Sequence, residues 1–470
     1  AYSERLGAPA AVFSSLERLG QPGSRAVVSG QQAGLLLGPL YTLSKAASAL
    51  ALARRLDQEA RPVLPIFWVA SQDHDSREVN HAHLLDVSET LHRLQLPLPE
   101  GVPSGHLALE PAWVETVCRA LAGVSANAGH RDAAVALLRG AAERATSYAD
   151  WFAGLLLRLL GPQGLIVCGP LEPAIAALFT GVLRAEIADP LASSRLVNEA
   201  GGRLREIGLT PQLGRAEGAT NLFLEEAGRR TLLHYDGAAF LSGTRRYAPE
   251  DLLALLEASP ERLTPAAALR PVTQDAVLPS AAVVVGPGEL RYFAQLRGVY
   301  ERHGVAMPLV WPRAEATVLE PPVRRILDKF GLTAAELMAD FGGVRERVLL
   351  ELHGHGELFA DALRDLEARS AALAAAARAI DPTLEGTVAR AESSLEATVA
   401  RLRGKSARAL AERDDTYTRQ LERLRRHLLP TGLPQERVLS PFSFMLKFGS
   451  QALVKALLAL PPEGEHTLEL

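Results

Sequence analysis

The chain has 470 residues, of which 48% are hydrophobic and 22% are charged, an ordinary composition for a globular protein too long for one simple core. The formal net charge of −4 argues against a protein that coats nucleic acid. Only Cys118 and Cys168 are present, so cysteine spacing supports neither a zinc cluster nor a disulfide framework. No apolar run is long enough to span a membrane, and residues 1–25 do not resemble a secretory signal. We expect a cytoplasmic protein of two or three domains with no nucleic-acid or membrane partner.

Residues 1 to about 340 alternate short apolar runs with helix-length segments such as 39–59, 150–160 and 289–303. The apolar runs are 25–30, 63–70, 164–170, 281–289 and 307–313. Continuous apolar strands that alternate with helices indicate a parallel sheet covered on both faces. We therefore predict an α/β fold with a Rossmann-like core.

Two stretches break this alternation and are predicted to be insertions into the core. The core then comprises residues 1–95, 151–204 and 263–343. The first insertion, 96–150, is expected to be helical. The second, 205–262, is expected to contain a β-hairpin, because Asp236 and Gly237 form a favourable hairpin turn.

From 344 to 429 the apolar residues recur every three or four positions, and "DPT" at 381–383 interrupts the pattern. This spacing predicts a long antiparallel helical coiled-coil hairpin with arms of about 50–65 Å. A narrow apolar stripe on such a hairpin can pair with a second protomer, so we expect a homodimer; the alternative is a solvated coiled coil. Residues 430–470 are expected to pack back on the core.

The segment 27–46, "VVSGQQAGLLLGPLYTLSKA", runs from a predicted strand into a predicted helix. Its glycines at 30, 34 and 38 match neither the dinucleotide-binding nor the nucleoside-triphosphatase pattern. Lys45 could reach a phosphate or carboxylate at the N-terminus of the helix, with Gly34 and Gly38 allowing close approach of the backbone. The alternative is a tight strand-to-helix turn with a surface lysine.

Polar side chains follow each predicted core strand, where ligands of open parallel sheets bind. After the second strand, His74 is a candidate general base oriented by Asp73 or Asp75. A metal site and a hydrogen-bonded loop are the alternatives. Because neighbouring residues on an extended chain point in opposite directions, these three cannot all face one ion, and we expect no metal site. His81 and His83 are interpreted as structural.

Arginines and a cysteine complete the candidates. Arg270 and Arg313 suit carboxylate binding because the guanidinium group is bidentate. Cys168 ends an apolar strand and is interpreted as a small buried hydrophobe rather than a nucleophile.

Several of these motifs, in this order, resemble a known family. They are "VVSGQQAGLLLGPLYTLSKA", "PIFWVASQDHDSREVNH", "LRPVTQDAVLP", "VVVGPGELRYFAQL", "MPLVWPR" and "PQERVLSPFSF". Over nearly its whole length the chain resembles the bacillithiol biosynthesis cysteine-adding enzymes. The resemblance implies a Rossmann-like core with two connecting insertions and a coiled coil that forms a homodimer. It also implies a ligase that joins L-cysteine to glucosaminyl-malate.

The resemblance carries the family motif positions onto this sequence. They are Gly30, Gln31, Gln32, Gly38, Pro39, Tyr41, Lys45, Asp73, His74, Asp75, Glu78, Asn80, Arg270, Gln274, Asp275, Gly286, Pro287, Glu289, Tyr292, Gln295, Arg313, Gln435, Glu436 and Arg437. One departure is Ala33, which stands where a proline is common in the family.

The implied chemistry constrains the site. An amine and a carboxylate do not condense spontaneously in water, so the cysteine carboxylate needs activation, for which ATP or another nucleotide is expected and Mg²⁺ is a candidate companion. The core resembles class I aminoacyl-tRNA synthetases in outline, but their "HIGH" and "KMSKS" signatures are absent. Two alternatives remain: a nucleotide-binding dimeric coiled-coil scaffold without ligase activity, and a nucleotidyltransferase that adenylates a small acid.

Overall fold

The computed structural model describes residues 1–125 and 127–470, which form two compact units. The first unit contains residues 1–318 and 436–468, together with Leu470. The second contains residues 319–435 and Glu469. The chain therefore leaves the first unit after Val318 and returns to it at Glu436.

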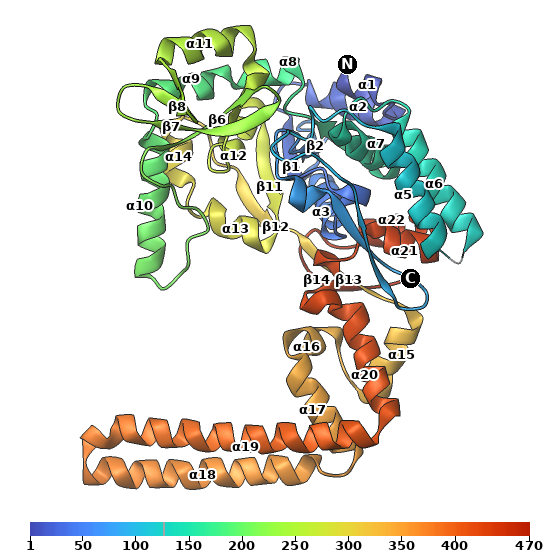
Figure 1. The fold of residues 1–470 in the computed structure, drawn as a ribbon, viewed down its shortest axis with the longest axis vertical. Coiled ribbons are helices and arrows are strands. Elements are labelled where there is room, and N and C mark those ends of the chain that lie inside the picture. Colours follow the sequence, from blue (N-terminus) through green and yellow to red (C-terminus); the bar gives the residue numbers. More distant parts are fainter. Residues whose placement is uncertain (126) are drawn as a thin grey trace. The chain divides into compact units, whose positions relative to one another are not determined.

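A five-stranded parallel sheet forms the centre of the first unit (Figure 1). Its strand order is β12-β11-β1-β2-β5. The strands are β1 Arg25–Gln31, β2 Val63–Val69, β5 Ile166–Cys168, β11 Ser280–Val285 and β12 Leu309–Pro312. Each of the five predicted core strands is present, and the Rossmann-like α/β fold is confirmed.

Both faces of this sheet are covered, which explains why its strands are continuously apolar. On one face, Val27, Val63 and Val284 pack with Ala49 and Ala53 of helix α3, Tyr41–Leu56. The alternate residues on these strands belong to the main core cluster on the other side.

The strand order reverses at the centre of the sheet. From β1 the chain passes to β2 and β5 on one side, and later to β11 and β12 on the other. The switch point therefore lies between the carboxyl ends of β1 and β11, where ligands of open α/β sheets bind.

The first insertion is helical at its centre, with α5 Pro111–Val124 and α6 Ala128–Ala142. It is preceded by an antiparallel pair, β3 His81–Leu85 and β4 Leu91–Gln95, within the range predicted as core. The sequence analysis did not predict these two strands.

The second insertion contains an antiparallel sheet in the order β10-β6-β7-β8-β9. Its strands are β6 Ala219–Glu226, β7 Arg229–Tyr235, β8 Phe240–Ser242, β9 Arg245–Tyr247 and β10 Leu263–Pro265. The β7–β8 turn lies at the predicted position: the Asp236 carboxylate accepts hydrogen bonds from the amides of Ala238 and Ala239, and Gly237 has a φ of +98°.

The other helices of the first unit support these sheets. They are α1 Tyr2–Arg5, α2 Ala10–Leu19, α4 Ser76–Val79, α7 Tyr148–Leu160, α8 Pro173–Ala176, α9 Thr180–Ala188, α10 Ala192–Glu206, α11 Pro249–Ala258, α12 Arg270–Val277, α13 Pro287–Phe293 and α14 Arg297–Arg302. Near the end of the chain, α21 Pro441–Phe448 contacts α6, and α22 Ser450–Leu458 contacts α3 and α7. Strand β14, Gly464–Glu469, pairs with β13, Ala314–Leu319.

The second unit is helical and starts earlier than the predicted hairpin. It contains α15 Pro321–Phe330, α16 Ala334–Ala339, α17 Phe341–Leu352, α18 Gly356–Ile380, α19 Glu385–Arg413 and α20 Asp415–Leu428. Residues of α15, α16, α17 and α20 share a separate apolar core that includes Val323, Leu337, Val348 and Leu424. The predicted range 344–429 is therefore only part of this unit.

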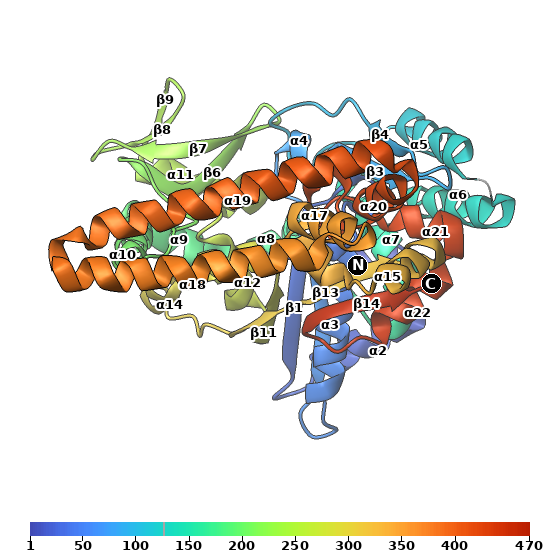
Figure 2. The same cartoon turned by 90° about the horizontal axis from the view of Figure 1, so that it is seen from below.

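Helices α18 and α19 lie side by side and antiparallel (Figure 2). With 25 and 29 residues, they are about 38 and 44 Å long at 1.5 Å per residue. The predicted arms were longer because the helices are interrupted at Gly354, with a φ of +73°, and at Asp414, which caps α20. Among the described residues, no helix combines the length and apolarity needed to cross a membrane.

Candidate active site

A cavity of about 860 Å³ lies at the carboxyl ends of β1, β2 and β11. Most of the family motif positions named above line it; those that do not are Gly38, Pro39, Asn80, Asp275, Gln295, Gln435 and Glu436. Those that line it are Gly30, Gln31, Gln32, Tyr41, Lys45, Asp73, His74, Asp75, Glu78, Arg270, Gln274, Gly286, Pro287, Glu289, Tyr292, Arg313 and Arg437. The parallel sheet thus brings together residues that are far apart in the sequence.

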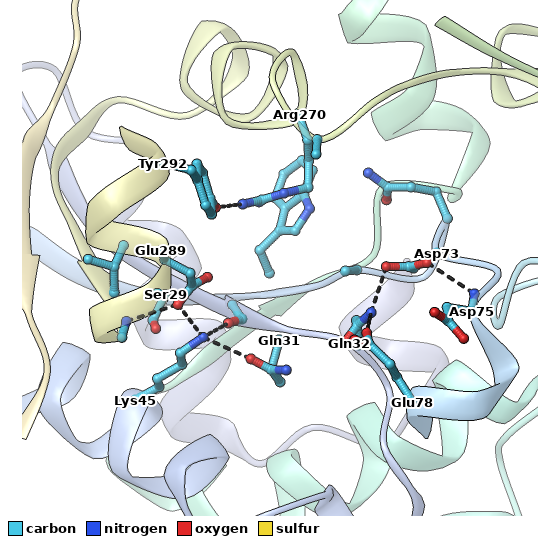
Figure 3. Close-up of a pocket in the computed structure, with 18 of the residues that line it drawn as sticks. Ser29, Gln31, Gln32, Lys45, Asp73, Asp75, Glu78, Arg270, Glu289 and Tyr292 are labelled. Atoms are coloured by element: carbon cyan, nitrogen blue, oxygen red, sulfur yellow. Dashed lines mark hydrogen bonds and ion pairs between the residues drawn. The ribbon is translucent and has the colours of Figure 1, made fainter. Parts of the chain in front are cut away.

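Lys45 is buried beside the β1–β11 switch point (Figure 3). Its Nζ lies 2.5 Å from Glu289 Oε2 and donates hydrogen bonds to Gln31 Oε1 at 2.8 Å and the Gly30 carbonyl at 3.1 Å. Burial lowers the pKa of Lys45, although Glu289 acts in the opposite direction. Burial would raise the pKa of Glu289, but Lys45 and the Gly286 amide hold that pKa below its usual value.

The predicted phosphate cradle is not formed at the N-terminus of α3. The Leu40 amide donates to the Leu439 carbonyl at 2.8 Å, so the chain itself occupies this helix end. A Cβ on Gly34 would lie 2.8 Å from Gly38 Cα, and Gly38 has a φ of +65°. These two glycines therefore serve a tight strand-to-helix turn, the alternative stated above. Lys45 is nevertheless a buried cavity residue rather than a surface lysine.

Arg270 is held by neutral partners. It donates to the Tyr292 hydroxyl at 2.9 Å and to Gln274 Oε1 at 3.3 Å. The Gln274 amide nitrogen donates to Asp275 at 3.0 Å, which in turn accepts from the Tyr300 hydroxyl at 2.5 Å. Asp275 thus lies outside the cavity but fixes the amide orientation that presents an oxygen to Arg270.

Arg313 does not have the free guanidinium group expected of a substrate clamp. It is 3% exposed, and both terminal nitrogens bind the carboxylate of Glu436, one of them at 2.8 Å. The Glu436 carboxylate also accepts from the Ala316 amide at 3.0 Å. The bidentate geometry predicted for Arg313 is present, but its partner is a residue of the same chain.

Two carboxylates of the β2 loop are organised by Gln32 (Figure 3). The Gln32 amide donates to Asp73 Oδ2 at 2.8 Å and to Glu78 Oε2 at 2.5 Å. Asp75 caps helix α4 by accepting from the Arg77 amide at 3.1 Å. The loop therefore holds three acidic groups at one side of the cavity.

His74 faces two residues that the sequence analysis did not select, Phe223 of β6 and Arg230 of β7. Arg230 NH1 lies 3.2 Å from His74 Nδ1. The Arg230 guanidinium carbon lies 3.9 Å from the centre of the Phe223 ring, and the imidazole and phenyl centres are 5.4 Å apart. The only signal available in the sequence was that this hairpin interrupts a core whose strand ends are polar.

Asn80 and the neighbouring histidines serve the β3–β4 pair. Asn80 is buried, and its carbonyl accepts from the Leu96 amide at 2.8 Å. The rings of His81 and His83 contact each other edge to face at 5.3 Å. In the described part of the chain, no group of three or more His, Cys, Asp or Glu side chains could hold a metal ion.

The cavity cations divide into two groups by their partners. Lys45, Arg77 and Arg313 pair with Glu289, Glu100 and Glu436. Within residues 1–125 and 127–470, Arg230, Arg270 and Arg437 form no ion pair with a carboxylate, and all three line the cavity. Arg437 lies 6.0 Å from the centre of the Tyr41 ring. In the described chain, the cavity lining therefore contains three arginines without a carboxylate partner as well as the carboxylates of Asp73, Asp75 and Glu78.

Family models match the chain over almost its whole length. The "Bacillithiol biosynthesis BshC, N-terminal Rossmann-like domain" matches residues 1–314, and the "C-terminal coiled-coil domain" of the same family matches residues 316–468. The chain belongs to the bacillithiol biosynthesis BshC family. The family resemblance inferred from the motifs is thus confirmed, as is the coiled-coil domain.

Curated BshC relatives cover most of both chains. A protein of Thermus thermophilus is 43% identical, over 100% of this chain and 92% of that protein. Relatives from Salinibacter ruber and Geobacillus thermodenitrificans are 36% and 31% identical, over 96% and 100% of this chain and 83% and 88% of those proteins. Each is named "Putative cysteine ligase BshC".

One solved structure, of a putative arginyl-tRNA synthetase from Campylobacter jejuni, aligns with 97% of this chain and 100% of its own. The identity is 9% and the TM-score is 0.26.

Proposed function

We propose that this protein is a ligase that joins the carboxyl group of L-cysteine to the amine of glucosaminyl-malate, completing bacillithiol. The observation that carries the proposal is membership of the BshC family over residues 1–314 and 316–468, together with curated relatives named "Putative cysteine ligase BshC". The cavity at the switch point of the sheet is the proposed active site.

The charge of the proposed acceptor suits the cavity. The malate group carries two carboxylates, and guanidinium groups bind carboxylates with two parallel hydrogen bonds. Arg270 and Arg437 line the cavity without a carboxylate partner in the described chain. We assign the malate carboxylates to these two arginines in place of Arg313.

Activation of cysteine is proposed to use ATP as a substrate. The cysteine carboxylate attacks a phosphorus atom of ATP and displaces either pyrophosphate or ADP. The sugar amine then attacks the activated carbonyl carbon, loses a proton, and releases AMP or phosphate as the amide bond forms. Mg²⁺ would arrive with the nucleotide, because the described residues provide no preformed metal cluster; no step above depends on a metal.

The protein is proposed to act as a cytoplasmic homodimer assembled through α18 and α19. Apolar side chains on these helices are exposed: Leu358 at 66%, Leu373 at 70%, Ile380 at 81% and Leu402 at 58%. A second copy of the same helices would bury them without requiring a different partner.

A single reaction tests the function. Purified protein is incubated with L-cysteine, ATP and glucosaminyl-malate, and the products are identified by mass spectrometry. The expected product is the cysteinyl amide, formed only when all three substrates are present, together with AMP or ADP.

The alternatives give different products in the same assay. A nucleotidyltransferase would release pyrophosphate from ATP and an acid without forming an amide. A scaffold would consume no ATP. Absence of the amide while the protein is folded would refute the ligase assignment.

A further inference from the structure

His74 is held against the second insertion by a rigid arginine. Besides its contact with His74, Arg230 donates through Nε to Thr264 at 2.8 Å and through NH2 to the Pro265 carbonyl at 2.8 Å. Its amide donates to the Gly101 carbonyl at 3.0 Å, and its guanidinium stacks on Phe223. These contacts fix the direction from which Arg230 approaches the imidazole.

The direction of the Arg230–His74 hydrogen bond follows from the chemistry of the two groups. A guanidinium group only donates hydrogen bonds, so the imidazole nitrogen that faces it must accept. Burial lowers the pKa of Arg230 to about 10, which leaves it charged at neutral pH. The His74 Nδ1 atom, 3.2 Å from Arg230 NH1, is therefore unprotonated, and a neutral ring carries its proton on Nε2.

The other charged groups around His74 do not reverse this assignment. Asp73 Oδ1 lies 4.0 Å from Nδ1, too far for a hydrogen bond. That oxygen accepts instead from the Asp75 amide at 3.1 Å. Burial and then Arg230 lower the pKa of His74, and they outweigh the opposing effects of Asp73 and Asp75. The aspartate-oriented general base expected from the sequence is not assembled.

The remaining ring nitrogen is free to meet a ligand. The His74 side chain is 30% exposed and lines the cavity. In the described part of the chain, its Nε2 atom forms no hydrogen bond. A neutral Nε2–H group can donate one hydrogen bond to an oxygen atom and cannot accept a proton.

We propose that Arg230 is a positioning residue that holds His74 as the neutral Nε2–H tautomer, and that His74 donates a hydrogen bond to an oxygen of the bound substrate. The first part concerns the free protein, whereas the second rests on the proposed ligase function. The acceptor oxygen belongs to an anionic or carbonyl group, such as the oxygen that gains negative charge when the amine attacks. Removal of the amine proton then falls to a carboxylate of the same loop, Asp73 or Asp75.

The tautomer is measured directly by NMR on the free protein. In histidine-labelled protein, long-range ¹H–¹⁵N correlations distinguish a protonated from an unprotonated ring nitrogen, and the His74 signals are those lost in His74→Gln. We expect an unprotonated Nδ1 and a protonated Nε2 between about pH 6 and 8, where free histidine changes charge. A protonated Nδ1 at neutral pH, in either charge state, overturns the proposal.

The role of Arg230 is tested by the same spectrum in two variants whose fold is checked by thermal unfolding. Arg230→Met removes the donor to Nδ1. Both neutral tautomers of His74 should then be populated, and the pKa of His74 should rise. Arg230→Lys keeps a cationic donor and should keep part of the wild-type pattern. An unchanged His74 spectrum in folded Arg230→Met contradicts the positioning role.

The role of His74 in the reaction is tested by two amide variants. His74→Gln places an amide donor near the position of Nε2, whereas His74→Asn places it near Nδ1. If His74 is a donor, we expect Gln to retain activity within about tenfold and Asn to lose on the order of 10²-fold or more, as when one donor to a developing oxyanion is removed. Equal losses of about 10²- to 10⁴-fold in both would indicate a general base instead.

The two measurements distinguish an error in the proposed ligase activity from an error in the proposed tautomer of His74. If the wild-type protein makes no amide but the NMR spectrum shows the Nε2–H form, the proposed function and the role of His74 in the reaction are both refuted. The positioning of His74 by Arg230 then stands.

Discussion

Arg270 differs from Lys45 and Arg313 in the partners that its side chain meets. Lys45 and Arg313 are compensated by Glu289 and Glu436, whereas Arg270 donates to a tyrosine hydroxyl and an amide oxygen. A cation held rigidly by neutral groups remains available to an anion. This difference in partners is the reason why we propose Arg270, and neither Lys45 nor Arg313, as a ligand of the acceptor.

Replacing Arg270 with lysine should weaken acceptor binding specifically. Lysine keeps the charge but loses the planar pair of donors, and loss of about 1.4 kcal/mol would raise the KM for glucosaminyl-malate about tenfold. The KM for ATP and cysteine should change little. Arg77→Lys is the matched control, because Arg77 is 81% exposed and pairs with Glu100. Equal effects of the two substitutions would remove Arg270 from the acceptor site.

We expect His106 to make the stability of the first unit depend on pH. Its Nδ1 lies 2.8 Å from both oxygens of Glu225. Hydrogen bonding to Glu225 raises the pKa of His106, with a further contribution in the same direction from Glu261, while burial opposes both. This contact joins the first insertion to the sheet of the second.

Because the pKa of His106 is raised in the folded protein, the pair with Glu225 should stabilise the fold more at low pH than at high pH. The charged pair stabilises the fold fully below the unfolded pKa of about 6.5, and its contribution is lost as pH rises through the folded pKa. His106→Gln should therefore lower the free energy of unfolding by on the order of 1 kcal/mol at about pH 5.5 and by much less at about pH 8.5. Urea unfolding at the two pH values measures this. A larger loss at the higher pH would contradict the assignment.

The turn between β1 and α3 is an element under local strain. Leu36 and Leu37 have φ values of 50° and 67°, although both are buried leucines. The Ser440 hydroxyl donates to the Leu36 carbonyl at 2.8 Å. Residues from the end of the chain therefore stabilise a conformation that leucine rarely adopts alone.

Gly38→Ala should destabilise the protein without a direct effect on ligand binding. Gly38 has a φ of 65° and a ψ of −152°, a region that is essentially restricted to glycine, so alanine should cost about 1–3 kcal/mol. Gly202 in α10 is the control, because a Cβ there meets nothing within 4 Å and alanine favours a helix. Denaturant unfolding compares the two. A stable Gly38→Ala protein with impaired ligand affinity would restore the cradle interpretation.

Elements whose pattern reflects burial could be predicted from the sequence. Strands β1, β2 and β11 are buried on both faces and read as continuous apolar runs, and the Asp236–Gly237 turn is set by its own residues. By contrast, β3 and β4 carry histidines and arginine on a partly exposed face. The alternation of apolar and polar residues in β3 and β4 is weak, so the sequence did not predict these two strands.

The site was predictable only where a strand end or motif marked it. His74 was selected because polar residues follow an apolar strand, and Lys45 because it lies on the helix after the glycine-containing turn. The partners of the site residues could not be predicted, because they are distant in the sequence. Arg230 and His74 are 156 positions apart, and Arg313 and Glu436 are 123 positions apart. No local spacing encodes such a pair.

At the scale of the whole molecule, the exposed apolar residues of α18 and α19 predict self-association. Replacing Leu373 and Ile380 with aspartate places charges on side chains that are 70% and 81% exposed, so the monomer fold should survive while the dimer dissociates. Light scattering after size-exclusion chromatography measures the mass.

Ile207→Asp is the control for this experiment, because Ile207 is 71% exposed and belongs to the first unit. It should leave the dimer intact. A wild-type monomer, or a dimer that tolerates both aspartates, contradicts the proposed interface.

The return of residues 436–468 to the first unit has a consequence for synthesis. The strands of the parallel sheet are synthesised long before Glu436 and Ser440. Until then, Arg313 lacks the Glu436 carboxylate, and the turn between β1 and α3 lacks the hydrogen bond from Ser440 to Leu36. A buried, unpaired charge costs several kcal/mol, which disfavours this arrangement until Glu436 has been synthesised. We therefore expect a chain truncated before Glu436 to be cut by proteases more readily than one that includes residues 436–468, and to lack the proposed ligase activity.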